Sequence, residues 1–438
     1  MTKRRRSVAW AGVSVLALSL AACGGTADPA GTSAGGQITV WSMWSEGEYG
    51  QRFLQRTIED FTKETGIKVT VAWKGRGVDK AILPTLNTPN PPADVVEGGV
   101  QQIAESLGET GGILDLSDVY AAKVPGEDVT VAEVVGKYKS SAQPMDGTGT
   151  LGAVRAVPYW LSADGIWYNS AVFPELKTAP PKTWDEFKKL LDSRKAAGRR
   201  PLAVDGSIPA YNWRYYDAFV RSLAGDGAVV KAATDKTGQT WRQPAYLKAA
   251  KHVEELAKGD YFVEGFEATK FPAVENMWAD NQSDFIVMGS WLPAEVQPVL
   301  ASGFEPSVFP FPGVDGQSAP KSPVVADGFG IVSKSENIEA AKKFVAYLVS
   351  EKVQRRVASE MNQFPLRAGA EAPKGMAALK TFLDDGGVSE SRYPAGMSDW
   401  RKEVFASNDD QLIFGKITAE EFVEQMATGT ASYWKSHK

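Results

Sequence analysis

The residue types that most often carry enzymatic chemistry are scarce in this chain. Its 438 residues include two histidines, His252 and His437, and one cysteine, Cys23. Zinc sites and nucleophile–histidine triads need several such side chains together, so both are close to excluded. No glycine-rich phosphate loop is present either. Carboxylates are abundant, with 53 Asp and Glu residues, so hydrolysis by a pair of carboxylates remains open.

Tryptophan is the informative excess. The chain has 13 of these residues, and several stand beside Gly, Asp or Glu where predicted strands end. Trp44, for example, is followed by Ser45-Glu46-Gly47. Because α/β folds bind ligands at the carboxyl ends of their strands, this placement favours ligand binding, although many of the other tryptophans belong to the core.

The elements that would position these side chains are clearest between Val157 and Val204. A near-continuous apolar run from Val157 to Tyr168 predicts a strand buried on both faces. Thr183 and Glu186 form a capping box for a helix that stops at Gly198. Leu202–Val204 is the next short strand. This unit predicts a sheet of parallel strands joined by crossover helices.

The start of the mature chain predicts a βαβαβ arrangement. Gln37–Trp44 is its first strand, and the helix that follows is closed by Gly66. Ile67–Val71 alternates as the second strand, and Ala93–Gly98 is the third, with Glu97 near its carboxyl end. Later strands are predicted at 285–288 and 324–332, and a helix is predicted from Asn337.

Several motifs occur in an order that resembles a known family. Tyr168-Asn169 with Phe173 is followed by PKTWDEF and by Gly198-x2-Pro201. Downstream come Gly289-Ser290-Trp291, the stretch PFPG at 310–313, and Asp327-Gly328-Phe329. The set resembles the maltose-binding-protein-like extracellular sugar-binding proteins of ABC importers, over nearly all of residues 37–438.

The resemblance implies a two-lobed α/β fold of the periplasmic-binding-protein kind (type II), with a ligand cleft between the lobes. The chain would cross between lobes three times, near Tyr159, Asp327 and Ala370. Lobe one would comprise 37–160 and 327–370, and lobe two 161–326 and 371–438. Hinged lobes of this kind can close around a ligand.

The first 36 residues predict export and anchoring. A basic start is followed by an apolar run of 15 residues, Val8–Ala22, which is too short to span a membrane and reads as a signal peptide, 1–22. Leu20-Ala21-Ala22-Cys23 resembles the lipobox of bacterial lipoproteins, which implies cleavage before Cys23 and lipidation of its sulfur. Residues 23–36 would be a flexible tether to the outer face of the cytoplasmic membrane.

Net charge argues against one class of partner. Cleavage would remove four positive charges and move the formal charge from −5 to −9. A moderately acidic protein is a poor candidate for binding nucleic acid.

A sugar site needs aromatic rings that face the C–H groups of the pyranose and polar groups that hydrogen-bond its hydroxyls. Trp291 is the first candidate, because GSW carries a stacking aromatic in much of the family, and Trp400 lies where the maltose-binding relative has one. Trp167 and Trp184 are assigned to the core. The remaining candidates lie at strand ends, crossings and helix starts: Trp44, Glu46, Glu97, Tyr159, Trp160, Asp164, Tyr211, Trp213, Asp327, Phe329 and Arg367.

The expected function is capture of an oligosaccharide, without chemistry or cofactor, for delivery to the permease of an ABC importer. The protein would be a monomer. Two alternatives remain open. One is a secreted glycoside hydrolase that uses two cleft carboxylates, and the other keeps the fold but binds a polyamine, a peptide or a phosphate compound.

Overall fold

The computed structural model describes residues 36–145, 150–389, 394 and 397–437. The predicted signal peptide and Cys23 lie outside these residues. Within them, no helix combines the length and the apolar character needed to cross a membrane.

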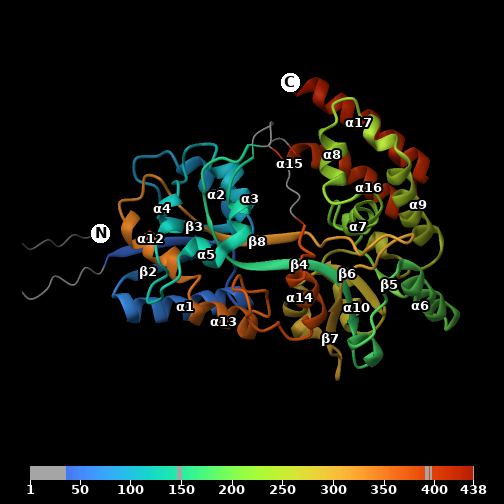
Figure 1. Ribbon diagram of the computed structural model, residues 1–438, viewed down its shortest axis with the longest axis horizontal. Helices are drawn as coiled ribbons and strands as arrows, with labels where there is room; N and C mark the ends of the chain where they lie inside the picture. The colour runs from blue at the N-terminus through green and yellow to red at the C-terminus, as the bar shows by residue number, and fades with distance from the viewer. Residues whose placement is uncertain (1–35, 146–149, 390–393, 395–396, 438) are drawn as a thin grey trace, which may run out of the picture. The chain divides into compact units, whose positions relative to one another are not determined.

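The described chain is built on one mixed sheet with the strand order β2-β1-β3-β8-β4-β6-β5, and β7 pairs beside β4 (Figure 1). The parallel pairs are β1 with β2, β1 with β3, and β5 with β6; the other pairs are antiparallel. The strands are β1 Gln37–Ser42, β2 Lys68–Trp73, β3 Val95–Gly99, β4 Val157–Asn169, β5 Leu202–Ala203, β6 Phe285–Gly289, β7 Pro306–Phe309 and β8 Val324–Ile331.

The parallel βαβαβ start of the chain is confirmed, but the prediction of parallel strands around the central unit is wrong. β6 lies between β4 and β5, antiparallel to β4 and parallel to β5. β4 and β5 therefore run in opposite directions. The apolar run of β4 reflects its place in the middle of the sheet, and burial on both faces does not by itself fix strand direction.

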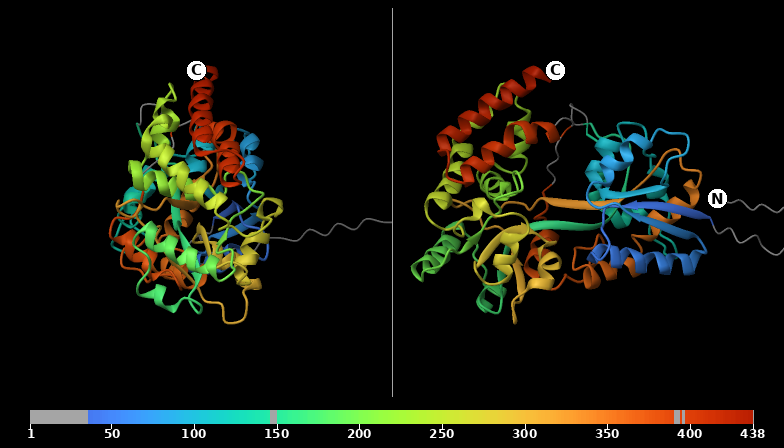
Figure 2. Two further views of the ribbon diagram at one scale, coloured as in Figure 1. Left: turned by 90° about the vertical axis from the view of Figure 1, so that its right-hand side faces the viewer. Right: turned by 180° about the vertical axis from the view of Figure 1, so that it is seen from behind.

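Two long strands join the two ends of this sheet. The first half of β4, Val157–Ala163, pairs with β8, and its second half, Asp164–Asn169, pairs with β6 and β7. β8 pairs with β3 on its other side. Figure 2 shows β4 in green and β8 in orange running side by side. The predicted crossings near Tyr159 and Asp327 both fall inside these strands.

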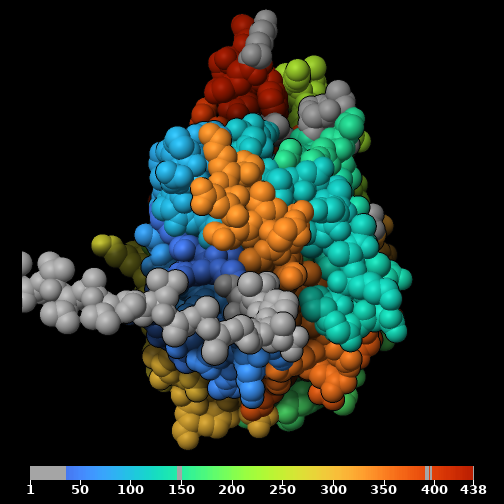
Figure 3. All heavy atoms as spheres, turned by 90° about the vertical axis from the view of Figure 1, so that its left-hand side faces the viewer, coloured from blue at the N-terminus to red at the C-terminus, as the bar shows by residue number. Residues whose placement is uncertain are grey.

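Helices cover both faces of the sheet around β1, β3 and β8. In Figure 1, α1 and α13 lie below these strands, and α2, α3 and α4 lie above. Gly66 ends α1 in the left-handed conformation, at φ 72°. Figure 3 shows α12 in orange between the light-blue segment that includes α2 and the teal segment that includes α4 and α5. The helices are α1 Tyr49–Thr65, α2 Val78–Ile82, α3 Val100–Gln102, α4 Ser117–Ala121, α5 Val131–Val135, α12 Ile338–Tyr347 and α13 Glu351–Glu360.

The other end of the sheet carries the remaining helices, with α7, α8, α16 and α17 above it and α10 and α14 below it in Figure 1. The predicted capping box is confirmed, because Thr183 and Glu186 each bond the other's backbone N–H. The helices are α6 Trp184–Ala196, α7 Trp213–Ala224, α8 Ala228–Thr234, α9 Pro244–Lys258, α10 Ala273–Ala279, α11 Leu292–Val296, α14 Ala377–Asp384, α15 Met397–Trp400, α16 Ala406–Ile413 and α17 Ala419–Ser436.

Buried apolar side chains of the described residues form two clusters. The first runs along the sheet and includes Trp44, Tyr159 and Trp167. The second lies among α6, α7, α9, α16 and α17 and includes Trp184. Trp167 and Trp184 are both buried, so their assignment to the core is confirmed.

Candidate functional site

Glu97, in the middle of β3, forms hydrogen bonds with side chains of two other segments. Its Oε1 accepts the indole N–H of Trp44 at 2.8 Å and the hydroxyl of Tyr159 at 2.7 Å, and its Oε2 accepts the hydroxyl of Ser42 at 2.5 Å. The residue is fully buried. Burial raises the pKa of the Glu97 carboxyl to about 7, although the three hydrogen bonds oppose this rise. Glu97 therefore positions the side chains of Trp44, Tyr159 and Ser42 by hydrogen bonds.

The ring of Trp44, which is bonded to this carboxyl group, lies near the ring of Trp160. Their centroids are 6.4 Å apart with planes inclined at 30°, and Tyr49 meets Trp44 edge-on at 4.8 Å. Both tryptophans are buried, and the indole N–H of Trp160 has no hydrogen-bond partner among the described residues. Glu46, two residues after Trp44, is exposed.

Arg76 covers the outer face of Trp44. Its guanidinium lies 4.5 Å from the ring centroid and donates to the backbone oxygen of Met43 at 2.7 Å and to Glu48 at 2.8 Å. The positive charge of Arg76 also lowers the pKa of the carboxyl groups of Glu295 and Asp327, against the effect of desolvation. Arg76 thus faces residues from both ends of the sheet.

Arg214, on α7, joins three of the predicted site residues. It forms an ion pair with Asp164 of β4 at 3.0 Å and lies over the rings of Tyr211, at 5.0 Å, and Trp291, at 5.2 Å. Three segments far apart in sequence therefore meet at one guanidinium.

Trp291, which follows β6, is half-buried and rests on Gly289. A Cβ atom at position 289 would lie 2.1 Å from the indole ring. The glycine of the GSW motif is therefore needed because the ring occupies the space of a side chain.

Two further carboxyl groups adjoin this set. Glu275, on α10, is buried and accepts the hydroxyl of Tyr211 at 3.1 Å, and Glu295, on α11, is exposed beside it. Burial and the charge of Glu295 raise the pKa of Glu275. The surrounding protein partly desolvates the carboxyl group of Glu295 and so raises its pKa, although the residue as a whole is exposed, and the charge of Arg76 opposes this rise. Burial also raises the pKa of Asp327 on β8, to about 6.

A profile described as "Bacterial extracellular solute-binding protein" matches residues 44–355. The chain belongs to this family. The family consists of extracellular binding proteins, so the glycoside hydrolase alternative is set aside.

Relatives in this family are similar in sequence to the chain over most of its length. The diacetylchitobiose binding protein NgcE of Streptomyces coelicolor is 26% identical over 390 residues, covering 86% of this chain and 79% of that protein. A maltooligosaccharide ABC transporter solute-binding lipoprotein of Streptococcus pneumoniae is 24% identical, covering 82% and 80%. The solved structure of the GacH receptor of Streptomyces glaucescens aligns with a TM-score of 0.71 at 18% identity, over 92% of this chain and all of that one. The last likeness establishes the α/β periplasmic-binding-protein fold.

The three remaining aromatic candidates of this solute-binding protein have different surroundings. Phe329 is fully buried against Tyr159, with ring centroids 5.1 Å apart. Trp400 is buried in the second cluster, stacked on Trp241 at 6.1 Å. Trp213 is half-buried under Arg401, at 5.1 Å. The first two side chains serve packing.

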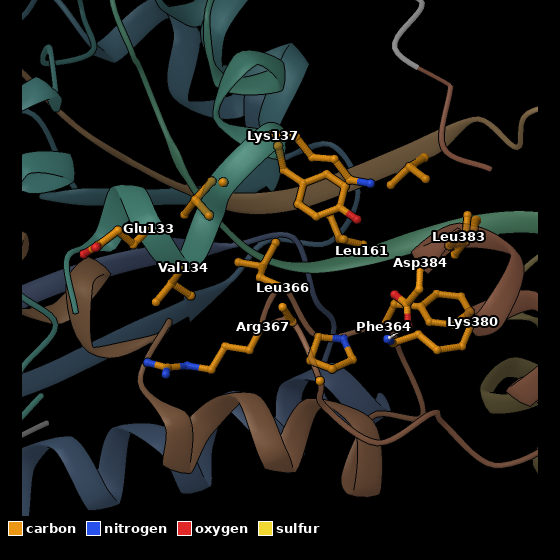
Figure 4. Close-up of a pocket in the computed structure, with 18 of the residues that line it drawn as sticks. Glu133, Val134, Lys137, Leu161, Phe364, Leu366, Arg367, Lys380, Leu383 and Asp384 are labelled. Atoms are coloured by element: carbon orange, nitrogen blue, oxygen red, sulfur yellow. Dashed lines mark hydrogen bonds and ion pairs between the residues drawn. The ribbon is translucent and has the colours of Figure 1, made fainter. Parts of the chain in front are cut away.

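Arg367 lies elsewhere as well. Its guanidinium pairs with Glu127 and donates to the backbone oxygen of Val349 at 3.0 Å. It lines a cavity of about 650 Å³ that is also lined by Leu161, on β4, and Lys380, on α14 (Figure 4). Leu161 precedes Ser162 and follows Trp160, so it faces away from Trp160 along the strand.

Sequence reasoning missed Tyr49, Arg76, Arg214, Glu275 and Glu295. None belongs to a motif, and α10 and α11 are too short to show a helical pattern. The one available signal was the position of Arg214 directly after Trp213. Groups of three or more His, Cys, Asp or Glu suited to a metal ion are absent from the described part of the chain.

Proposed function

We propose that the protein captures an oligosaccharide between two lobes and delivers it to the permease of an ABC importer. The lobes are 37–160 with 327–370, and 161–326 with 371–438. The proposal rests on membership of the solute-binding family and on relatives whose names mention diacetylchitobiose binding and maltooligosaccharide transport.

The observation that carries the sugar assignment is the group of aromatic and charged side chains around Arg76 and Arg214. Trp291 and Tyr211 offer ring faces to the C–H groups of a pyranose. The charged side chains beside them can hydrogen-bond the hydroxyls. Glu97 and Tyr159 would support Trp44 through their hydrogen bonds. The proposed binding residues are Trp44, Tyr49, Arg76, Trp160, Asp164, Tyr211, Arg214, Glu275, Trp291, Glu295 and Asp327.

The proposed binding residues come from both lobes, so ligand binding can favour closure of the lobes. Tyr49 and Arg76 come from lobe one, whereas Arg214 and Glu295 come from lobe two. A ligand that touches both groups binds the closed arrangement more tightly, and this difference in affinity shifts the population toward closure. The permease would then recognise the closed, loaded form.

The anchor is part of the same proposal. Lipidation at Cys23 would hold the monomer at the outer face of the cytoplasmic membrane, with 23–36 as the tether. The lipoprotein relative of Streptococcus pneumoniae supports this arrangement.

A thermal-shift screen of the mature protein against mono- and oligosaccharides tests the function. At least one sugar should raise the melting temperature, and the same sugar should quench or enhance tryptophan fluorescence. Trp291→Ala should weaken both responses. A response to polyamines, peptides or phosphate compounds with none to sugars would overturn the assignment in favour of a different solute.

A further inference from the structure

One side of α7 continues inward from the proposed site. Its residues Arg214, Asp217, Ala218 and Arg221 follow the three- and four-residue spacing that places side chains on the same side of a helix. All four line a small cavity of about 20 Å³, which Asp164 of β4 also lines. Every residue that lines the cavity belongs to the proposed lobe two, so closure of the lobes does not need to change it.

Asp217 contributes a buried acceptor without a donor. The residue is only 2% exposed, and its Oδ2 accepts the Nε–H of Arg221 at 2.5 Å. Its Oδ1 is buried and accepts no hydrogen bond from any described residue. Leaving a buried acceptor unpaired costs free energy, so Oδ1 needs a donor that the described side chains do not supply.

Arg214 contributes a buried donor without an acceptor. Its Nε lies 3.0 Å from Asp164 Oδ1 in an ion pair, but the Nε–H forms no hydrogen bond with that oxygen or with any other described residue. Its Nη1 donates to the backbone oxygen of Tyr211 at 2.7 Å. An unpaired donor and an unpaired acceptor thus belong to two residues that line the same cavity.

The size and the charge of the cavity suit one water molecule. A buried water needs about 10–15 Å³ of free space and a few polar partners. The charges of the cavity walls nearly balance, so a neutral molecule fits better than an ion. The charged residues that line it are Arg214, Arg221, Lys321, Asp164 and Asp217.

We propose that a buried water accepts the Nε–H of Arg214 and donates to Oδ1 of Asp217, which makes Asp217 a positioning residue for the sugar-binding guanidinium. The inference rests on the proposed function, because Arg214 is one of the proposed binding residues. The guanidinium lies over the rings of Tyr211 and Trp291, at 5.0 and 5.2 Å. Holding it there before the sugar arrives reduces the conformational entropy that binding must remove.

A crystal structure of the ligand-free protein with its ordered waters tests the bridge directly. A water should lie within about 3.2 Å of both Arg214 Nε and Asp217 Oδ1. A cavity without a water, or a water that contacts only one of the two groups, would overturn the inference.

Ala218→Val tests the role of the water without changing either charged group. The added methyl groups should fill the cavity and displace the water, which frees the guanidinium to move relative to Trp291. Tryptophan emission of the ligand-free variant should therefore shift, and the shift should disappear in a Trp291→Phe background. Ala224→Val, at the exposed end of the same helix, is the matched control and should leave emission unchanged. Wild-type emission in a folded Ala218→Val variant would contradict the proposal.

Asp217→Asn tests whether the bridge serves sugar binding. The amide keeps the size of the carboxylate and an oxygen for Arg221, but it presents an N–H to the water in place of an acceptor. The dissociation constants for maltotriose and diacetylchitobiose, the two probes, should rise about 2- to 10-fold, as expected for the loss of one hydrogen bond. Asp284→Asn weakens a comparable buried pairing with Arg194 and Arg199, away from the site, and should leave both affinities unchanged.

The outcomes separate the inference from the proposed function. Wild-type affinity in the Asp217→Asn variant would overturn the positioning role and leave sugar capture intact. If that variant does not fold, the same titration of Ala218→Val decides the role, with the same direction expected. If the wild type binds no sugar of the screen, the proposed function fails and Asp217 has no role in sugar capture, while the ligand-free structure and emission still decide the water bridge.

Discussion

The indole N–H of Trp44 donates to the carboxyl group of Glu97 over 2.8 Å, inside a fully buried environment. Trp44 follows β1, and Glu97 belongs to β3, which is parallel to β1. This hydrogen bond thus joins β3 to the segment that follows β1, at the Trp44 ring that the ligand is proposed to approach. Glu97 acts as a positioning residue, and its protonation affects stability.

Glu97→Gln should fold and should become relatively more stable than the wild type as pH rises. The amide oxygen can replace Oε1 for Trp44 and Tyr159, and the amide N–H can donate to Ser42. In the wild type, the folded protein holds the carboxyl proton up to about pH 7, compared with 4.5 ordinarily. Its contribution to stability is therefore full below about pH 4.5 and is lost as pH rises to about 7, a change of about 3 kcal/mol at most.

Melting temperatures of both proteins at about pH 5 and about pH 8 test this expectation. The difference between variant and wild type should grow in favour of the variant at the higher pH. Glu97→Leu is the control, because it leaves the donors of Trp44 and Tyr159 unpaired and should destabilise the protein at both pH values. A constant difference between the Glu97→Gln variant and the wild type would show that the buried carboxyl does not titrate.

Trp291→Ala should weaken sugar binding about 5- to 150-fold, since stacking on an exposed aromatic face contributes roughly 1–3 kcal/mol. The stability of the free protein should change little, because the ring is half-buried. Trp400→Ala is the matched control. Its ring is buried on Trp241, so truncation should cost about 3–5 kcal/mol of stability.

Ligand titration and thermal melting of the two variants separate the roles. Unchanged affinity in the Trp291 variant, with a large loss of stability, would move that residue from the site to the core. Reduced affinity in a folded Trp400 variant would return Trp400 to the site.

Gly289→Ala should reproduce the binding defect of Trp291→Ala without removing the ring. The added Cβ would lie 2.1 Å from the indole, and a half-exposed side chain can swing away more cheaply than the strand can move. The sugar dissociation constant should rise by about tenfold, with a shift in tryptophan emission in the free protein. Wild-type affinity with unchanged emission would contradict the tight packing of ring and glycine.

Cys23→Ser should release the protein from the membrane while leaving sugar binding unchanged. The serine hydroxyl cannot form the thioether that the lipobox resemblance implies. Fractionation of cells that produce the variant, followed by immunoblotting, measures the release. If the variant stays with the membrane as the wild type does, another segment or partner must hold it there.

Much of the fold could be predicted because its elements have strong local patterns. β4 was expected at Val157–Tyr168 and spans Val157–Asn169. The box of Thr183 and Glu186 marked the start of α6 correctly. In contrast, residues 121–150 appear polar and irregular, yet α5 is a helix of five residues with its own capping box, Thr130 and Glu133. So short a helix gives no periodic signal.

The site was harder to predict because burial depends on tertiary contacts. Trp400 ends the short helix α15 and Trp291 precedes the short helix α11, but burial of Trp400 against Trp241 identifies Trp400 as core. Glu275 and Glu295 belong to separate short helices, and only the fold brings their carboxyl groups together. Strand direction was also undetermined, since the order of β4, β6 and β5 comes from long-range pairing.

The central position of β8 has a consequence for the order in which the protein can fold. β8 begins at Val324, but it lies between β3 and β4, whose residues are made far earlier. Until β8 arrives, those two strands present unpaired edges, which invite aggregation. Such distant pairing also gives a high contact order and slow folding. A chain destined for export would therefore remain unfolded until most of it has been synthesised, and a truncation before Val324 would lack the strand that closes its sheet.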